Sequence, residues 1–348
     1  MKYVQAINDA MKVAMNLDQK VIAYGLGIDD PKRIFGSTKD LKELFGPERV
    51  FDMPTAENAM TGVAIGVALA GYRPVMVHQR LDFFLLALDQ LVNAAAKWHY
   101  MFGAQNNVPM VIRLIVGRGW GQGPTHSQSL HSWFAHIPGL KVVMPATPSD
   151  AKGLLLSSIF DGNPVIFIEH RWLHEQEGNV PEGDYRLSLG QAAIIQPGDD
   201  ITIVGNSLMT IEAKHAATHL AAQGINCEVI DLRTIRPLDW ASIESSVNKT
   251  GRLIALDIGH GFGSIAGEII AGITERCFGN LKSAPVRVCL PDHATPTSFA
   301  LTKNFYPGAK NIVDAASQIF GRKFESKSLE EQRTWSHDVP GDWFKGPF

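Results

Sequence analysis

The stretch LKVVMPATPSDAKGLLLSSIFDGNPVIFIEH (140–170) decides the fold class of this chain. Its apolar runs at 140–146 and 163–170 are short and continuous, as in strands that are covered on both faces. The segment between them, 149–160, has the apolar spacing of a helix, and Ser149 is expected to be its N-cap. A strand–helix–strand unit of this kind is typical of parallel sheets.

The same alternation extends over the rest of the chain. Further continuous apolar runs predict strands at 21–27, 108–116, 199–206, 225–232, 251–258 and 285–290. Segments with helical apolar spacing, or rich in small residues, predict helices at 59–71, 85–102 and 211–223. The chain is therefore expected to be an α/β protein with two doubly wound, mostly parallel sheets.

The character of the sequence changes in HEQEGNVPEGDYRLSLGQ (174–191), which is polar and has little periodicity. A chain of 348 residues is longer than one ordinary domain, so a domain boundary is expected in this segment. The sequence thus predicts a first domain at 1–180, a second at 181–324 and a tail at 325–348. The tail carries Trp335, Trp343, Phe344 and Phe348, which indicates that it packs on another surface.

Composition excludes several classes of protein. Hydrophobic residues make up 45% and charged residues 19%, as in an ordinary globular protein, and the net charge of -3 gives no reason to expect nucleic acid or an anionic membrane as partner. No apolar run approaches the roughly 18 residues of a membrane span, and the N-terminus does not resemble a signal peptide. The three cysteines, Cys227, Cys277 and Cys289, are far apart, which favours reduced thiols and a cytoplasmic location.

Glu57 is the first candidate for chemistry. It stands in DMPTAENAMTGVAIGVALAGYRP (52–74), after a strand-like segment and at the start of a helix of small residues. The dipole of that helix stabilises an acid in the first turn, which explains Glu57 without a function. A catalytic carboxylate is the alternative. The small residues predict a helix that packs very close to a neighbour.

A second candidate region is RGWGQGPTHSQSLHSWFAHIPG (118–139), which contains the glycines Gly119, Gly121 and Gly123 and the histidines His126, His131 and His136. The spacing of five residues places the histidines on different faces of a helix, which argues against a shared metal ion. The first histidine follows a glycine-rich loop on the carboxyl side of a predicted strand, where α/β sheets bind ligands. Proton transfer suits histidine there, although a capping or core histidine remains the alternative.

Other patterns are weaker. GHGFGSIAG (259–267) lies between a strand and a helix, as nucleotide loops do, but its glycines run G-x-G-x-G. His170 and His174 adjoin the polar linker and are expected to be solvated. The sequence has no Walker loop, no H-E-x-x-H and no G-x-S-x-G motif.

Four stretches carry a resemblance to a known family, in the right order: LKELFGPERVFDMPTAENAMTGVAIGVALAGYRPVM, ALDQLVNAAAKWHYMFG, HSQSLHSWFAHIPGLKVVMPATPSDAKGLL and CEVIDLRTIRPLD. Together they resemble the β subunit of thiamine diphosphate-dependent pyruvate and branched-chain 2-oxo acid dehydrogenases (E1). The resemblance runs from about Val4 to Gly321. It implies a transketolase-like pyrimidine-binding domain followed by a transketolase C-terminal-like domain.

The resemblance implies roles for individual residues. Glu57 matches the glutamate that hydrogen-bonds the aminopyrimidine N1′ of thiamine diphosphate and drives the imino tautomer that deprotonates C2. Phe83 matches the aromatic residue that stacks on the pyrimidine, and Gln79 lies near it at the cofactor pocket. His126 matches the histidine near the thiazolium that helps to bind the 2-oxo acid or to hand the acyl group on. A loop site that holds potassium through carbonyl oxygens in some relatives is matched by Met110, Ser158, Ile159, Asp161 and Asn163.

The resemblance also implies partners. In this superfamily a G-D-G motif holds Mg²⁺ and the diphosphate, and this sequence has none. The Mg²⁺ ligands are therefore expected on an α-type E1 chain, in an α₂β₂ heterotetramer with active sites between α and β. The C-terminal domain would dock an E2 acyltransferase, whose lipoyl domain accepts the acyl group.

The sequence departs from the family at two positions, Leu26 and Val77, where relatives have the glutamates of an acidic channel between active sites. Nearby, Arg80 suits a substrate with a second anionic group or faces the partner chain. The leading interpretation is the E1 β subunit of a 2-oxo acid dehydrogenase. The alternatives are a thiamine diphosphate-dependent decarboxylase or carboligase without a lipoyl acceptor, and a non-catalytic scaffold subunit, against which Glu57 and His126 argue.

Overall fold

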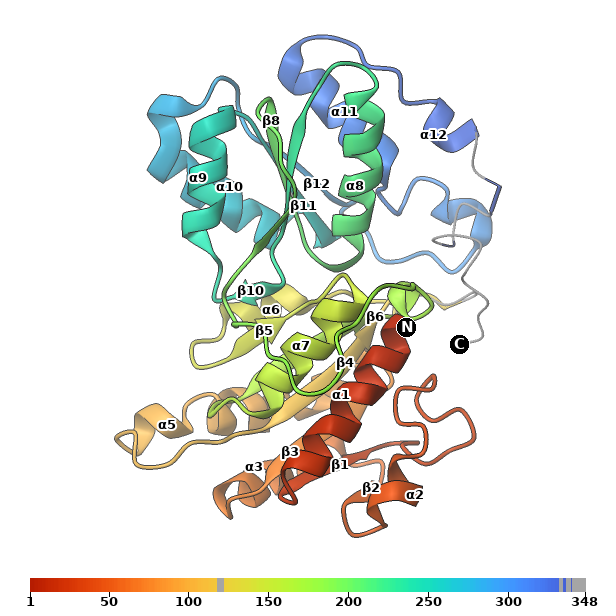
Figure 1. Ribbon diagram of the computed structural model, residues 1–348, viewed down its shortest axis with the longest axis vertical. Coiled ribbons are helices and arrows are strands. Elements are labelled where there is room, and N and C mark those ends of the chain that lie inside the picture. The colour runs from red at the N-terminus through yellow and green to blue at the C-terminus, as the bar shows by residue number, and fades with distance from the viewer. Residues whose placement is uncertain (118–121, 332–333, 336–338, 340–348) are drawn as a thin grey trace. The chain divides into compact units, whose positions relative to one another are not determined.

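The structure, a computed structural model, describes residues 1–117, 122–331, 334, 335 and 339. The chain forms two compact units, whose helices and strands are drawn in Figure 1. The first unit comprises Met1–Gly117 and Trp133–Leu189, and the second comprises Arg118–Ser132 and Gly190–Phe348. The short segment before Trp133 thus belongs with the second unit, although its neighbours on both sides belong to the first.

Parallel strands form the centre of the first unit. Their order across the sheet is β5-β6-β4-β3-β1-β2, and each pairing is parallel. The strands are β1 (Val21–Gly25), β2 (Val50–Asp52), β3 (Arg73–His78), β4 (Val111–Val116), β5 (Lys141–Val143) and β6 (Val165–His170). Every residue of β1, β4 and β6 is buried, which explains why these strands are continuous apolar runs in the sequence.

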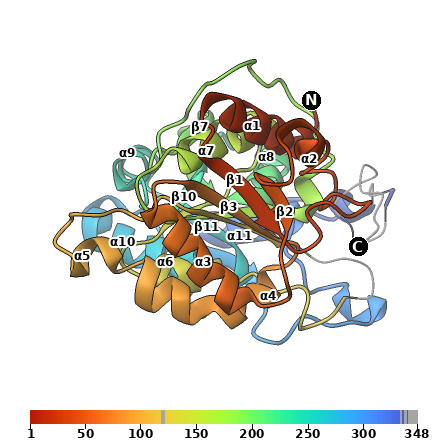
Figure 2. The same ribbon diagram turned by 90° about the horizontal axis from the view of Figure 1, so that it is seen from below.

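Helices cover both faces of this sheet. On one face α1 (Tyr3–Leu17) packs against α7 (Pro148–Ile159), while α3 (Glu57–Leu69) lies on the other (Figure 2). Shorter helices are α2 (Leu41–Phe45), α4 (Leu81–Phe84), α6 (His131–His136) and the 3-10 turn η3 (Arg171–Leu173). The prediction of Ser149 as N-cap of α7 is wrong: Thr147 is the N-cap, its hydroxyl accepts a hydrogen bond from the Asp150 amide at 3.1 Å, and Pro148 opens the helix.

The single helix predicted at 85–102 is also wrong, because the segment is broken into three pieces. These are a 3-10 turn η1 (Leu85–Ala87), a π-helical stretch η2 (Gln90–Ala95) and α5 (Trp98–Met101). At the end of η2 the Ala96 amide donates to the Leu91 carbonyl, the five-residue spacing of a π-helix. Gly139 approaches the Ala96 carbonyl so closely that a Cβ on it would lie 1.9 Å from that oxygen. This tertiary contact overrides the helical propensity of the segment.

The second unit has its own sheet, with the strand order β12-β11-β8-β9-β7. The strands are β7 (Ala193–Gln196), β8 (Ile201–Gly205), β9 (Cys227–Asp231), β11 (Leu253–His260) and β12 (Val286–Leu290), and the short β10 (Thr234–Arg236) follows β9. Only the β7–β9 pairing among them is antiparallel. The predicted α/β class with mostly parallel sheets is therefore confirmed.

Helices of the second unit pack in pairs: α8 (Ser207–Ala221) on α11 (Ala309–Phe320), and α9 (Trp240–Thr250) on α10 (Ile265–Cys277). Short pieces are η4 (Phe278–Asn280), η5 (Phe299–Thr302) and α12 (Ser328–Glu331). Within the described ranges, the helices are all too short or too polar to cross a membrane. Of the aromatic residues in the predicted tail, Trp343, Phe344 and Phe348 lie outside the described residues.

Candidate active site

One edge of the first unit's sheet carries three of the predicted site residues, Glu57, Gln79 and Phe83. Because the strands are parallel, their carboxyl ends all lie at the same edge, where α/β sheets bind ligands. Glu57 follows β2 at this edge, and Gln79 and Phe83 follow β3. The structure thus brings three of the four residues predicted to act on the cofactor or substrate to one edge of one unit.

Glu57 is the first residue of α3 and is 6% exposed. Its backbone carbonyl accepts a hydrogen bond from the Thr61 hydroxyl at 2.8 Å, which fixes the first turn of the helix. The preceding residue, Ala56, has no side chain that could cap the helix. Glu57 is the one acidic residue in the first turn of α3. A carboxylate at this position is stabilised by the positive end of the helix, and burial strengthens any hydrogen bond that it accepts.

Two aromatic neighbours after β3 have opposite environments. Phe84 is fully buried, with its ring 4.9 Å from that of His78, whereas Phe83 is 39% exposed. An aromatic side chain that is partly exposed at this edge has the chemistry to stack on a flat ring. The short helix α4 therefore anchors itself through one phenylalanine and presents the other.

Gln79 links the loops that follow β1 and β3. Its side-chain amide donates to the Leu26 carbonyl at 3.2 Å. Gly27 has φ +74, and a Cβ there would lie 2.5 Å from the Gln79 amide nitrogen, so the contact requires glycine. In the structure Gln79 positions these two loops beside the edge that carries Glu57.

His126 lies in the second unit, in the segment before Trp133. It is half-buried, its Nδ1 lies 3.0 Å from the Thr125 hydroxyl, and its amide donates to the Gly123 carbonyl at 3.3 Å. Gly123 packs tightly, since a Cβ on it would lie 2.2 Å from the Thr297 hydroxyl. The preceding glycines, Gly119 and Gly121, lie outside the described residues.

Sequence reasoning missed a buried pair in the second unit. His131 Nε2 lies 2.6 Å from Asp257 Oδ1, and both side chains are fully buried. Asp257 also accepts hydrogen bonds from the amides of Gly259 and Ile265, both at 2.8 Å. Burial alone would raise the pKa of Asp257, but the His131 ring and the amides of Gly259 and Ala266 bring it below its ordinary value. The segment 259–267, which has a weak likeness to a nucleotide-binding loop, thus donates its amides to the Asp257 carboxylate of the chain itself.

The prediction that His170 and His174 are solvated is wrong, because they are 4% and 0% exposed. The N-terminal segment covers His174: the Tyr3 amide donates to the Gln176 carbonyl at 2.8 Å, and the Tyr3 ring stacks on His174 at 5.9 Å. The His170 ring packs against Trp172, whose amide donates to its Nδ1 at 3.2 Å. Beneath them Arg113 and Glu169 form a fully buried bidentate ion pair, with contacts of 2.6 and 3.0 Å. These contacts come from distant parts of the chain, so local polarity could not reveal them.

The residues matched to a potassium loop surround the opposite, amino edge of the sheet. They are Met110, Ser158, Ile159, Asp161 and Asn163, which precede β4 and β6. Arg73 donates from Nη1 to the carbonyls of Ile159 and Asp161, at 3.1 and 3.2 Å. Since a guanidinium already lies on two of the expected ligand atoms, the loop as it stands does not fit a second cation.

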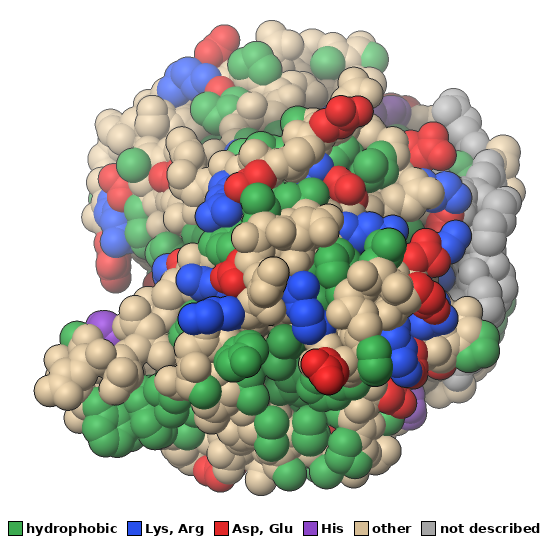
Figure 3. Space-filling model, turned by 60° about the horizontal axis from the view of Figure 1, so that its bottom comes forward, with side chains coloured by type: hydrophobic (Ala, Val, Ile, Leu, Met, Phe, Trp, Pro, Cys, Tyr) green, Lys and Arg blue, Asp and Glu red, His purple; other side chains and the backbone are tan. Residues whose placement is uncertain are grey.

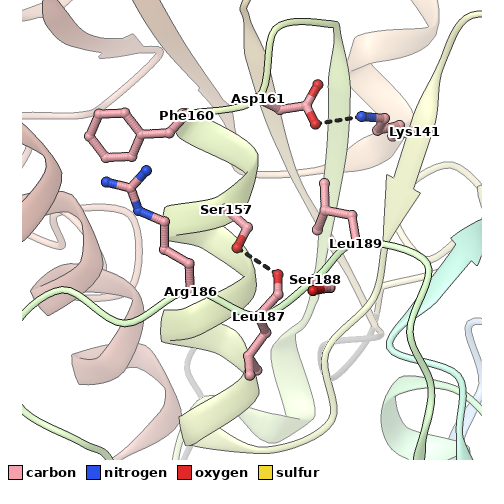
Figure 4. A pocket seen from close by; sticks show the side chains of 8 residues that line it. All are labelled: Lys141, Ser157, Phe160, Asp161, Arg186, Leu187, Ser188 and Leu189. Carbon is pink, nitrogen blue, oxygen red and sulfur yellow. Dashed lines mark hydrogen bonds and ion pairs between the residues drawn. The ribbon is translucent and has the colours of Figure 1, made fainter.

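A polar pocket of about 380 Å³ opens beside this loop, lined by Lys141, Ser157, Phe160, Asp161, Arg186, Leu187, Ser188 and Leu189 (Figure 4). Lys141 pairs with Asp161 across it, and the Ser157 hydroxyl donates to the Leu187 carbonyl at 2.6 Å. Because it lies at the amino edge, this pocket is remote from Glu57. Among the described residues, histidine, cysteine and carboxylate side chains nowhere form a group of three or more that could hold a metal ion.

Known proteins match the chain along most of its length. Residues 1–176 match the model of the transketolase pyrimidine-binding domain, and residues 190–312 match that of the transketolase C-terminal domain. The β subunit of acetoin:2,6-dichlorophenolindophenol oxidoreductase from Cupriavidus necator is 42% identical, over 89% of this chain and 95% of that protein. The β subunit of 2-oxoisovalerate dehydrogenase from Bacillus subtilis is 40% identical, over 92% and 98%.

Two further relatives agree with these. The β subunit of the pyruvate dehydrogenase E1 component from Bacillus subtilis is 37% identical, over 92% of this chain and 98% of that protein. A solved structure of a split-gene transketolase, an inactive β4 tetramer, is 21% identical with a TM-score of 0.75, over 93% of this chain and 99% of that one, and supports the fold. With both domains matched in order, the chain belongs to the family of β subunits of thiamine diphosphate-dependent 2-oxo acid dehydrogenases.

Proposed function

We propose that this chain, with an α-type E1 partner, decarboxylates a 2-oxo acid and transfers the acyl group to a lipoyl domain. The observation that carries the proposal is the buried carboxylate of Glu57 at the edge where Phe83 presents its ring. When bound, thiamine diphosphate supplies the carbon nucleophile and the electron sink for loss of CO₂. A buried acid and an exposed aromatic ring suit a cofactor with a basic, flat heterocycle, so these residues fit it.

The chain's own residues have distinct proposed tasks. Glu57 would hold the proton that it shares with a ring nitrogen, in a site where its burial excludes competing water. Phe83 would stack on the ring and orient it. His126 would bind the 2-oxo acid or move a proton to the oxygen of the substrate.

Metal ions enter the proposal in different ways. Mg²⁺ is proposed to be held by the α-type chain, because carboxylates and carbonyls near a diphosphate are its usual ligands and this sequence has no G-D-G motif. Potassium at the loop of Met110 and Asp161 is not required by the proposal, since Arg73 already donates to two carbonyls there. No step is therefore assigned to potassium.

An exposed apolar face supports the need for a partner chain. Helix α3 packs on η1 and η2, and large apolar side chains around them are exposed, namely Val63, Leu86, Tyr100, Met101 and Phe102. Figure 3 shows hydrophobic side chains gathered on this side of the molecule. We call these five residues the apolar face. Surfaces of this kind mark protein–protein contacts, and we propose that the α-type chain covers it, in an α₂β₂ assembly that docks an E2 acyltransferase.

The test pairs the chain with its α partner, thiamine diphosphate and Mg²⁺, and follows CO₂ release from a panel of 2-oxo acids, with and without a lipoyl domain. Replacing Glu57 by Gln should lower kcat by at least about 100-fold with the melting temperature unchanged. The matched control is Glu48→Gln, at an exposed glutamate, which should leave kcat unchanged.

The possible outcomes separate the candidate functions. Turnover that needs the lipoyl domain supports the dehydrogenase, whereas turnover without it would place the chain among decarboxylases or carboligases. If Glu57→Gln and Glu48→Gln were equally active, Glu57 would have no catalytic task.

A further inference from the structure

Two buried arginines lie around one phenylalanine ring at the carboxyl edge of the first unit. Arg80 follows β3 and is 4% exposed, and Arg171 follows β6 and is 5% exposed. Their guanidinium carbons lie 5.8 and 4.6 Å from the centre of the Phe35 ring. Both cations therefore lie against the same ring, and they come from the ends of two different strands.

The backbone that presents Phe35 is strained. Arg33, Ile34 and Phe35 have φ values of +47, +47 and +59, a left-handed conformation that is unfavourable for residues other than glycine. Strain of this kind persists where the surrounding structure fixes it, and it gathers at ligand sites. The left-handed backbone thus marks the loop of Phe35 independently of the two arginines.

The hydrogen bonding of Arg80 is incomplete. Its Nη1 donates to the Gly117 carbonyl, at the end of β4, at 3.1 Å, which fixes the plane of the guanidinium. Its Nη2 is buried and, among the described residues, has no hydrogen-bond partner. A buried guanidinium with an unmatched N–H is costly unless an anion or another acceptor meets it.

Burial acts against the charge of both arginines. Burial lowers the pKa of Arg80, although Asp82 opposes this, and it lowers the pKa of Arg171 to about 10, with Glu175 opposing and Arg80 contributing by repulsion. Glu175 itself forms an ion pair with Lys2 at 2.6 Å. The histidines beside the arginines are uncharged, because burial lowers the pKa of both His78 and His170 to about 3.

We propose that Arg80 and Arg171 bind a second anionic group of the substrate, so that the enzyme acts on a 2-oxo acid whose far end carries a carboxylate or a phosphate-like group. The inference rests on the proposed function, because it takes Glu57 at the same edge as the place of the chemistry. Arg80 lies after β3 and Arg171 after β6, with β4 between these two strands in the sheet. Guanidinium groups match such oxyanions with paired hydrogen bonds.

The experiment compares substrates that differ only at the far end, in the complex with the α chain, thiamine diphosphate and Mg²⁺. The substrates are 2-oxoglutarate, 2-oxopentanoate of equal chain length, and 2-oxo-4-phosphonobutanoate. The wild type should prefer one of the two dianionic substrates over 2-oxopentanoate by at least about 10-fold in kcat/KM. The preferred one tells a carboxylate site from a phosphate site.

Substitution of Arg80 by Met should lower kcat/KM for the preferred dianion by about 10- to 100-fold and leave 2-oxopentanoate within about 3-fold. The Arg80→Lys variant retains the charge, and its kcat/KM for the preferred dianion should lie between those of the wild type and of Arg80→Met. This variant serves as the test if Arg80→Met folds poorly. The matched control is Arg186→Met, since Arg186 also stacks on a phenylalanine, 3.9 Å from Phe160, but at the amino edge. It should leave the preference unchanged.

Two results would overturn the inference. One is a wild type that turns over 2-oxopentanoate but neither dianion, which leaves the proposed function standing. The other is an Arg80→Met variant that slows all three substrates equally, as a purely structural arginine would. Conversely, if no 2-oxo acid is decarboxylated while calorimetry shows Arg80-dependent binding of a dianion, the proposed function fails and the anion site stands.

Discussion

Two buried histidines, His78 and His170, tie the stability of the protein to pH. Burial lowers the pKa of each to about 3, from an ordinary value near 6.5. Between these two values the unfolded chain binds protons that the folded chain does not. The free energy of unfolding should therefore be highest above pH 6.5 and fall as the pH drops toward 3, by up to about 1.4 kcal/mol per pH unit for each histidine.

A His78→Phe variant tests this directly. It should reduce the slope of the free energy of unfolding against pH, between pH 5 and 6, by up to about 1.4 kcal/mol per pH unit, measured by urea unfolding. The control is His99→Phe, since His99 is exposed and should leave the slope unchanged. An unchanged slope in His78→Phe would mean that His78 is already protonated in the folded protein.

Single residues were predictable from the sequence where their setting is local. The place of Glu57 at a helix start follows from the strand-like segment and the small-residue helix around it. His170, His174 and His131 could not be placed in this way. Their burial depends on partners far along the chain, such as Tyr3 over His174 and Asp257 against His131.

At the level of elements, the close approach of Gly139 to η2 explains why a helix-like sequence is not one helix. Gly139 has φ +94, and a Cβ there would meet the Ala96 carbonyl at 1.9 Å. Gly139→Ala should lower the free energy of unfolding by about 2–5 kcal/mol, the sum of backbone strain and overpacking. Gly183→Ala measures the backbone strain alone, because Gly183 has φ +69 and no atom lies within 4 Å of the added Cβ.

That comparison is made by denaturant unfolding of both variants. Gly183→Ala should lower the free energy of unfolding by about 1–2 kcal/mol, so equal losses in the two variants would contradict a specific contact with η2.

The strands, unlike the segment 85–102, were predictable where they are long and buried. Buried strands such as β4 and β6 are continuous apolar runs and were predicted, whereas short or mixed ones such as β2 and β7 have no clear local pattern.

At the level of the whole molecule, the exposed apolar face indicates that the isolated chain is incomplete. Leu86, on η1, is 70% exposed, and η1 packs against α3, the helix that begins with Glu57. A partner bound over this face would lie against elements that pack on α3, the helix that begins with Glu57. The sequence predicted a partner from a missing cofactor motif, and the exposed Leu86 is the position at which the proposed contact can be tested.

A pair of leucines tests that place. Leu86→Glu puts a charge into the proposed contact and should weaken binding of the α-type chain by at least about 10-fold, or about 1.4 kcal/mol, measured by analytical ultracentrifugation. Leu44→Glu is the matched control: Leu44 is 60% exposed, but it lies on α2, which contacts α1 on the other face of the sheet. It should bind the α-type chain like the wild type. Because both changes add one charge to an exposed leucine, equal weakening by the two would point to a general charge effect and remove the apolar face as the binding surface.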